Sequence, residues 1–125
     1  KGGHPALGEL RWWYWRHNAH LVIKTERVES SQSTQVFWIA TIVEDSYTIH
    51  KVKEIATRNG SVRVGIPSMS DDGDKLAWTV CDLYCELFEL ELQSGEEIRT
   101  VFSCPEGKEQ GIKWDGSKAI KECGD

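Results

Sequence analysis

The longest apolar stretch of the chain is QVFWIATIV, residues Gln35–Val43. Apolar residues occupy both alternating faces of this segment, a pattern typical of a strand enclosed between two layers of structure. Its length suits a strand and falls far short of the roughly 18 apolar residues that span a bilayer. We therefore predict a core strand here and no membrane span.

Turn-forming residues divide the rest of the chain into segments of about 8 to 18 residues. Val, Ile and Thr number 25 against 15 for Leu, Ala and Met, a balance that favours strands over helices. The predicted strands lie near residues 8–16, 20–29, 34–44, 47–57, 61–67, 76–84, 86–93, 97–104 and 111–114. We expect an all-β fold, an antiparallel β-sandwich or jelly-roll-like barrel of about eight or nine strands.

Residues 82–92 leave an alternative open, because their leucines also fall at helical spacing. We prefer a strand, since the β-branched pair Thr79-Val80 leads into the segment and a turn follows it. Regular alternation then requires a β-bulge near Glu86 or Leu87.

Length and charge limit the class of protein. The chain has 125 residues, 39% of them hydrophobic, which predicts a single globular domain over residues 1–125, with residues 1–7 as a loose lead-in. Its net charge of −5 argues against nucleic acid as the main partner. The oligomeric state is left open.

Four cysteines, Cys81, Cys85, Cys104 and Cys123, lie in the C-terminal half, an even number that permits two disulfides. The sequence starts at Lys1 without a Met or an apolar targeting segment, so we interpret it as a processed or trimmed form. Both observations predict a secreted, disulfide-stapled protein. Four free thiols in a cytosolic protein and a zinc site are the alternatives.

Spacing suggests how the cysteines pair. If residues 76–93 form one strand, Cys81 and Cys85 lie about 13 Å apart on one face, too far for a bridge. A two-residue turn after this strand would place Cys85 opposite Cys104 and leave Cys81 to Cys123. We favour this arrangement. A bulge or a longer turn would permit Cys81–Cys104 with Cys85–Cys123 instead.

Asn59 lies in the N-x-[ST] sequence Asn59-Gly60-Ser61 and is a candidate glycosylation site. Asn-Gly is also the preferred pair of a tight hairpin turn, which needs no sugar to explain it. Such a turn would place Thr57 opposite Val62.

The segment Arg11-Trp12-Trp13-Tyr14-Trp15-Arg16 is the candidate binding site. In a strand, Trp13 and Trp15 share one face and Trp12 and Tyr14 share the other, so large rings are expected on a surface. Exposed rings flanked by arginines suit recognition of a protein or of a sugar.

Metal and catalytic motifs are weak by comparison. His17 and His20 are three residues apart and converge only at a turn, and the acidic turn 71–74 lacks the spacing of a calcium loop. We therefore predict no cofactor and no metal. A hydrolase would have to draw on Glu44, Asp45, His50 and Glu54, without a recognisable motif.

We expect a small secreted interaction protein, such as an effector, a toxin-like factor or a recognition module, that docks a protein partner through exposed aromatic rings and is not an enzyme. The alternative is a carbohydrate-binding module in which the tryptophans of residues 12–15, with Trp38, Trp78 or Trp114, form a stacking platform. A small secreted hydrolase is the third hypothesis.

Overall fold

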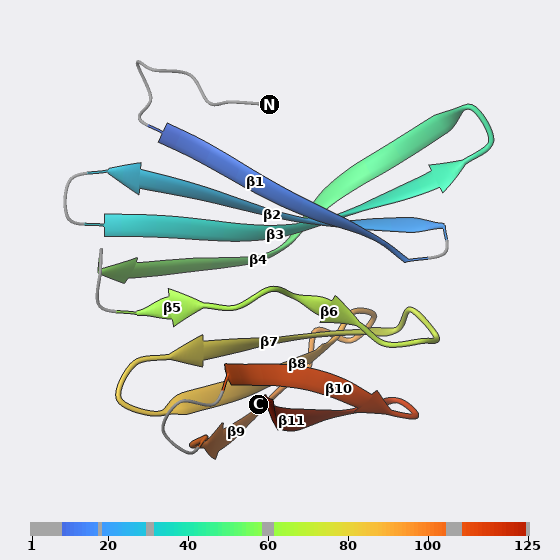
Figure 1. The fold of residues 1–125 in the computed structure, drawn as a ribbon. Helices are drawn as coiled ribbons and strands as arrows, with labels where there is room; N and C mark the ends of the chain where they lie inside the picture. The colour runs from blue at the N-terminus through green and yellow to red at the C-terminus, as the bar shows by residue number, and fades with distance from the viewer. Residues whose placement is uncertain (1–8, 18, 30–31, 59–61, 105–108, 125) are drawn as a thin grey trace. The chain divides into compact units, whose positions relative to one another are not determined.

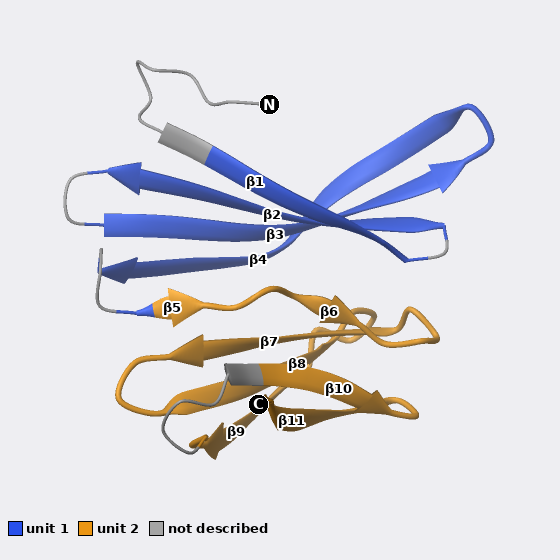
Figure 2. Ribbon diagram, in the orientation of Figure 1, with its two compact units in different colours: residues 1–62 blue, residues 63–125 orange. Residues whose placement is uncertain are grey.

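The structure is a computed structural model that describes residues 9–17, 19–29, 32–58, 62–104 and 109–124. These residues form β-strands and no helix, and every strand pairing is antiparallel (Figure 1). The all-β prediction is therefore confirmed. The described sheets are open, and none closes into a barrel. The chain divides into two compact units, residues 1–62 and 63–125 (Figure 2).

Unit 1 is a four-stranded meander in the order β1-β2-β3-β4. Its strands are β1 (Glu9–His17), β2 (His20–Glu29), β3 (Gln32–Val43) and β4 (Ser46–Arg58). Strand β2 has the bounds predicted from the sequence. Strands that follow one another in the chain are neighbours throughout this sheet.

The predicted core strand is β3, but it is fully buried along one face only. Phe37 and Ile39 are buried on that face, whereas Trp38 on the other face is half-buried and Ile42 and Val43 at the end are exposed. The expectation of a strand enclosed on both faces is wrong for most of the second face. The sequence pattern shows that this face is apolar, but it does not show that other parts of the chain leave the face partly exposed.

Unit 2 combines a five-stranded sheet with a hairpin. The sheet runs β5-β7-β8-β9, and β6 also pairs with β7. Its strands are β5 (Arg63–Val64), β6 (Ser68–Met69), β7 (Lys75–Cys81), β8 (Cys85–Glu91) and β9 (Glu97–Phe102), and the hairpin is β10 (Glu109–Asp115) with β11 (Lys118–Gly124). Ile112 and Trp114 of the hairpin pack with Ala77, Leu87 and Phe102 of the sheet in one hydrophobic cluster.

The described residues form eleven strands, not eight or nine. The predicted strand 61–67 contains only β5 and part of a loop before β6, and the chain end forms two strands where one was expected. The helix considered for 82–92 does not form, because β8 is a strand. Its pairing with β7 runs without a register shift from Lys75↔Glu91 to Cys81↔Cys85, so the predicted β-bulge is absent.

Two disulfides are present, as predicted, but their pairing differs from the one we favoured. Cys81 bonds to Cys85, with Cα atoms 4.1 Å apart, and Cys104 bonds to Cys123. The assumption of one continuous strand was wrong, because the turn 82–84 reverses the chain and makes Cys81 and Cys85 direct partners on β7 and β8. The second disulfide ties the segment after β9 to β11.

The turn between β8 and β9 also differs from the two-residue turn that we expected. Leu90 pairs with Glu97, and Gly95 adopts a φ of 80°, a conformation that glycine favours. Cys85 therefore faces Phe102 and not Cys104. A longer turn moved the register by two residues, which removed the geometric basis of the Cys85–Cys104 prediction.

The hairpin predicted around Asn59 does not form. Residues 59–61, including the candidate glycosylation site, lie outside the described residues. On either side of them, Thr57 pairs with Ser33 of β3, and β5 pairs with β7. The alternation that suggested the hairpin reflects two strands that belong to different sheets.

Candidate functional site

Strand β1 presents the aromatic segment at the edge of the sheet of unit 1. It pairs with β2 in an unbroken register from Glu9↔Val28 to His17↔His20. Side chains alternate along a strand, so Trp12, Tyr14 and Arg16 share one face, while Arg11, Trp13 and Trp15 share the other. The structure thus divides the six predicted binding residues into two groups of three.

The face that carries Trp12 and Tyr14 continues across the whole sheet. Tyr14, Ile23 and Trp38 lie side by side on β1, β2 and β3. Further along the same face, Ile42 of β3 pairs with Tyr47 of β4, and Ala40 pairs with Ile49. We call the surface formed by these apolar side chains the aromatic face: Trp12, Tyr14, Ile23, Trp38, Ala40, Ile42, Tyr47 and Ile49.

Most of the large side chains on the aromatic face are exposed. The exposed fractions are 47% for Trp12, 68% for Tyr14, 41% for Ile42, 66% for Tyr47 and 49% for Ile49. Single exposed apolar residues are common on protein surfaces, whereas contiguous exposed apolar patches are typical of interaction surfaces in general.

Trp38 is fixed at the centre of this surface. Its Nε1 donates a hydrogen bond of 3.0 Å to Thr25 Oγ1 on β2. Because the indole N–H is satisfied within the sheet, the half-buried ring offers its carbon surface to a ligand. Ile23 and Ala40, which flank it in the sheet, are buried and form the floor of the face.

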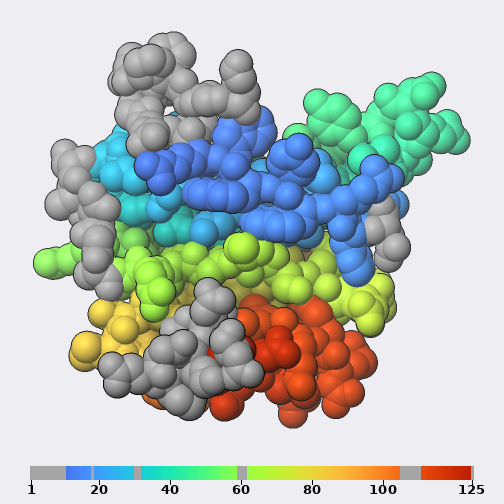
Figure 3. All heavy atoms as spheres, in the orientation of Figure 1, coloured from blue at the N-terminus to red at the C-terminus, as the bar shows by residue number. Residues whose placement is uncertain are grey.

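Strands β3 and β4 extend beyond β1 and β2 as a two-stranded arm, residues 42–50, that projects from the sheet (Figure 1). Figure 3 shows this green segment standing clear of its surroundings. Every residue of the arm is exposed, including Val43 on the opposite side. Such a hairpin has little packing to stabilise it alone, which favours contact with another surface.

The arm owes its placement to two local features. Its turn has Glu44 at a φ of 54°, and Ser46 Oγ donates a 3.2 Å hydrogen bond to the carbonyl of Val43. Within the sheet, before the arm begins, the register of β3 and β4 shifts between Phe37↔Lys53 and Trp38↔Lys51, which leaves Val52 as the extra residue of a β-bulge. A bulge bends and twists a strand pair, consistent with the departure of the arm from the sheet.

Trp13 and Trp15 lie on the opposite face of the sheet, away from the aromatic face. Lys24 Nζ lies 4.9 Å from the centroid of the Trp13 ring, a cation–π contact. Burial lowers the pKa of Lys24 below its usual value, and the charge of Glu26 opposes the shift. The Trp13 ring therefore has a contact partner within the sheet, whereas Trp12 and Tyr14 belong to the aromatic face.

Charged residues lie on β1 and at the turn of the arm. Arg11 and Arg16, both exposed, flank the rings on β1. The acidic pair Glu44-Asp45, also exposed, forms the turn of the arm. Arg16 shares the face of Trp12 and Tyr14 and stands in the row of Ala40 and Ile49, next to the arm, whereas Arg11 lies on the opposite face.

A pocket of about 370 Å³ adjoins Trp38 on the same face. Besides Trp38 and Val36 it is lined by polar side chains, namely Thr25, Arg27, Glu29, Thr34 and Glu54. Arg27 Nε is buried and has no hydrogen-bond partner among the described residues. Donors and carboxylates beside an indole ring suit a polyhydroxylated ligand as well as a side chain of a protein.

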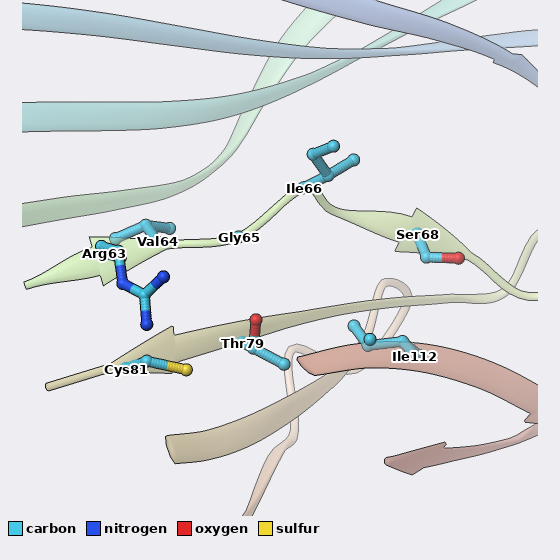
Figure 4. Close-up of a pocket in the computed structure, with 9 residues that line it drawn as sticks. Arg63, Val64, Gly65, Ile66, Ser68, Thr79, Cys81 and Ile112 are labelled. Carbon is cyan, nitrogen blue, oxygen red and sulfur yellow. The ribbon is translucent and has the colours of Figure 1, made fainter. Parts of the chain in front are cut away.

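Unit 2 has a larger pocket, of about 580 Å³, between β5, β7 and β10 (Figure 4). Thr79 points its hydroxyl toward Gly65, whose N–H donates to the Thr79 carbonyl at 2.7 Å. Among the described residues that line it, Arg63 is the one charged group, and none is a carboxylate or a histidine. The pocket therefore lacks the acid–base pair that hydrolysis would need.

The residues considered for catalysis do not converge. His50 pairs with Ile39 and points to the face opposite the aromatic face, whereas Glu54 pairs with Val36 and points to the aromatic face. His17 and His20 are opposed across the first turn. Among the described residues, no group of three or more His, Cys, Asp or Glu side chains is placed to hold a metal ion.

The hydrogen bonds of the acidic turn 71–74 are formed within the turn itself. Ser70 Oγ donates to Asp72 Oδ1 at 2.6 Å, and the N–H of Asp74 donates to the same oxygen at 3.0 Å. These bonds lower the pKa of Asp72. The carboxylate thus stabilises the hairpin between β6 and β7.

Sequence reasoning found part of the aromatic face and missed the rest. Trp12 and Tyr14 were predicted, and Trp38 was named as a platform candidate, but Ile42, Tyr47 and Ile49 were not. Their alternation around the Glu44-Asp45 turn is the pattern that places them on one face. Two other platform candidates lie in unit 2 and not on the aromatic face: Trp78 is buried and stacked on Phe88, and Trp114 is partly buried against the core of that unit, with its N–H donated to Ser68 Oγ.

Comparison with protein-family models, curated proteins and solved structures finds no match for this chain. In the part of the chain that the structure describes, no helix has the length and apolar character needed to cross a membrane. The function is therefore inferred from the site itself.

Proposed function

We propose that this chain is a non-enzymatic interaction protein that docks a protein partner through the aromatic face. The observation that carries the proposal is the shared exposure of Trp12, Tyr14, Ile42, Tyr47 and Ile49 on one side of one sheet. Aromatic side chains are enriched in protein interfaces, and a few well-placed ones supply most of the binding energy.

The mixture of aromatic and aliphatic side chains favours a protein over other ligands. Ile42 and Ile49 offer branched surfaces that fit an apolar side chain and have no flat ring on which a sugar or a base could stack. The net charge of −5 opposes binding to a phosphate backbone. A protein surface is the partner that uses the whole aromatic face.

An extracellular setting, with a role as an effector, a toxin-like factor or a recognition module, belongs to the same proposal. Two disulfides support it, because such bonds persist in oxidising compartments. A sandwich or jelly-roll-like packing of the sheets is likewise the arrangement that we propose for the intact fold.

Site-specific photo-cross-linking tests the docking proposal. A benzophenone amino acid at Tyr14 is compared with the same group at Leu83, which is 93% exposed on the β7–β8 turn of unit 2. We expect Tyr14 to give a discrete protein adduct that excess unlabelled wild-type chain suppresses and that the Trp12→Ser variant suppresses less. Equal, non-competable labelling from both positions would refute docking at this face.

A carbohydrate ligand is the second candidate, favoured by the pocket beside Trp38. The guanidinium of Arg27 and the carboxylate of Glu54, which line this pocket, could bind sugar hydroxyls while a sugar ring stacks on Trp38. Tryptophan fluorescence titrations with a polysaccharide panel test it, with Arg27→Met as the matched variant. A spectral shift that the variant abolishes supports this candidate, and no response across the panel contradicts it.

A further inference from the structure

We infer that two copies of this chain pair along strand β1, antiparallel and two-fold symmetric about Trp13, so that the sheets of their units 1 continue into each other. The inference goes beyond the proposed docking function, because it uses the edge of the sheet and leaves the aromatic face to another partner. It is drawn from the difference between the two edges of the sheet and from the order of side chains along β1.

The two edges of the sheet are protected to different degrees. In the described part of unit 1, β1 and β4 are the outer strands. An edge strand is a template for pairing with another chain, and natural edges are blunted by lysines, prolines and bulges. Strand β4 has such features, because a bulge at Val52 lies between Lys51 and Lys53.

Strand β1 has none of them. Its nine residues include no Lys, Pro or Gly, and the central segment Trp12–Trp15 is uncharged. Its register with β2 is unbroken from end to end, so no bulge bends the edge. Strand β1 is therefore long, regular and aromatic, the kind of edge that pairs with another strand.

Backbone geometry restricts how two β1 edges can pair. Along an antiparallel strand, the N–H and C=O groups of successive residues point alternately toward the neighbouring strand and away from it. The groups of β1 that point away from β2 therefore belong to every second residue. Two copies can join these groups only if the two-fold axis passes through a residue. Pairing over the full length Glu9–His17 places the central residue, Trp13, on the axis.

This register places complementary side chains on the aromatic face. Trp12 lies opposite Tyr14 of the second copy, and Tyr14 lies opposite Trp12 of that copy. Both residues are exposed in the single chain. Cross-strand aromatic pairs stabilise a sheet, and here the symmetry forms the pair twice.

The other face is complementary in the same register. Trp13 lies opposite Trp13 of the second copy, and Arg11 lies opposite Trp15 of that copy, where a guanidinium can stack on the indole. On the β2 side, Arg11 keeps Glu26 of its own copy as its cross-strand neighbour. No cation of one copy faces a cation of the other, so the strand is self-complementary on both faces, as a two-fold interface requires.

The neighbouring registers are poorer. Moving the axis to Trp12 or to Tyr14 pairs seven of the nine residues of β1. With the axis on Tyr14, Arg11 would lie opposite His17 of the second copy, which opposes two basic groups. The register about Trp13 therefore combines the greatest length with the best side-chain pairs.

Pairing along β1 also enlarges the docking surface. Residues that lie opposite each other in a sheet carry their side chains on the same face. The aromatic faces of the two copies therefore adjoin, with Trp12 and Tyr14 of both copies at the centre. A docking partner would contact residues from two chains.

Sedimentation velocity tests the pairing on the purified, oxidised chain from about 1 to 200 µM, a range in which moderately weak dimers dissociate. We expect a concentration-dependent dimer. Trp13→Glu sets two carboxylates opposite each other, and Tyr14→Glu removes both aromatic pairs, so each should weaken the dimer by about tenfold or more. Tyr47→Glu, at an exposed position of the aromatic face on β4, is the matched control and should leave it unchanged.

Two features keep these variants informative. Lys24 of β2 lies opposite position 13 and can neutralise the new carboxylate within the folded sheet. Tyr14 is 68% exposed, so its substitution removes little packing. If circular dichroism shows that Trp13→Glu is unfolded, Tyr14→Glu decides. A dimer that Tyr14→Glu leaves intact overturns the inference.

Pulsed electron paramagnetic resonance tests the register. A nitroxide attached to a keto amino acid at Arg16 leaves the cysteines untouched. With the axis on Trp13, Arg16 and its counterpart lie six residues apart along the paired strands, about 20 Å between Cα atoms. Axes on Tyr14 and on Trp12 give about 14 and about 27 Å, and either of these distances would overturn the register.

The outcomes separate this inference from the docking function. A chain that stays monomeric over the whole range overturns the pairing, and the docking function stands if the Tyr14 cross-linker captures a different protein. A dimer that Tyr47→Glu weakens and Trp13→Glu does not is held by the aromatic face, and it also overturns pairing along β1. The masses of the Tyr14 adducts distinguish a second copy from a different protein.

Discussion

Trp38 and Thr25 are joined across the sheet of unit 1 by a 3.0 Å hydrogen bond from the indole Nε1 to Oγ1. The two residues are diagonal neighbours on β3 and β2, because Trp38 pairs with Ile23 and Thr25 pairs with Val36. The bond satisfies the one polar group of the indole and fixes the ring at the centre of the aromatic face. A rigid aromatic anchor loses little conformational entropy on binding.

Thr25→Val tests this relationship. The substitution keeps the shape of the side chain and removes the acceptor, so we expect the free energy of unfolding to fall by about 1 kcal/mol. Partner binding should weaken as well, because Trp38 is no longer held. Thr25→Ser keeps the hydroxyl and is the control, and denaturant unfolding of the three proteins gives the comparison. Equal losses for Val and Ser would contradict a role for the hydrogen bond.

The two disulfides should contribute unequally to stability. Cys104–Cys123 spans 19 positions and Cys81–Cys85 spans 4. On the chain-entropy description, removing the longer link costs about 3 kcal/mol and removing the shorter one about 2 kcal/mol. Thermal unfolding of the paired Cys→Ser variants measures both. A larger loss for the Cys81/Cys85 variant would contradict loop closure as the main contribution.

Lys24→Met should change how stability depends on pH. Burial lowers the pKa of Lys24 in the folded chain below its ordinary value of 10.5, so the unfolded chain binds more protons between these two values. The wild type therefore gains stability relative to the variant as the pH rises toward 10.5. We expect the variant to be the more stable at neutral pH, with an advantage that shrinks in alkaline buffer.

Urea unfolding at several pH values checks this difference, with Lys113→Met at an exposed position of β10 as the control. A stability advantage of Lys24→Met that grows with pH would contradict desolvation as the dominant cause.

Gly65→Ala should destabilise unit 2. The added methyl group would collide with the hydroxyl of Thr79, which packs against Gly65. We expect a loss of about 1 to 3 kcal/mol, typical of overpacking. Repeating the substitution in a Thr79→Ala background should reduce the loss, since the colliding atom is then absent. An equal loss in both backgrounds would place the constraint in the backbone of Gly65.

Much of the secondary structure could be predicted from the sequence, because local alternation sets it. β-branched residues and turn clusters located β2 with its observed bounds, and alternation alone placed Trp12 and Tyr14 on a common face. These properties depend on residues that are neighbours along the chain, so the sequence alone is enough to predict them.

Predictions of pairing between distant residues were wrong where the pairing depended on the length of one turn. A three-residue turn made Cys81 and Cys85 partners, and a longer turn before β9 set Cys85 opposite Phe102. A difference of one or two turn residues changes every cross-strand pair beyond it. The exposure of Ile42 depends on β1 and β2 ending before the arm, which no pattern within β3 reveals.

Hydroxyl-radical footprinting of the chain in its native source tests the central claim most directly, that a protein covers the aromatic face. Purified chain at low concentration is the reference, and Tyr84, half-exposed at the β7–β8 turn, is the internal control. Joint protection of Trp12, Tyr14 and Tyr47, with Tyr84 labelled as in the reference, is the predicted result. Labelling of all three at the reference rate would contradict the claim, and protection of Trp12 without Tyr47 would indicate the smaller footprint of a sugar.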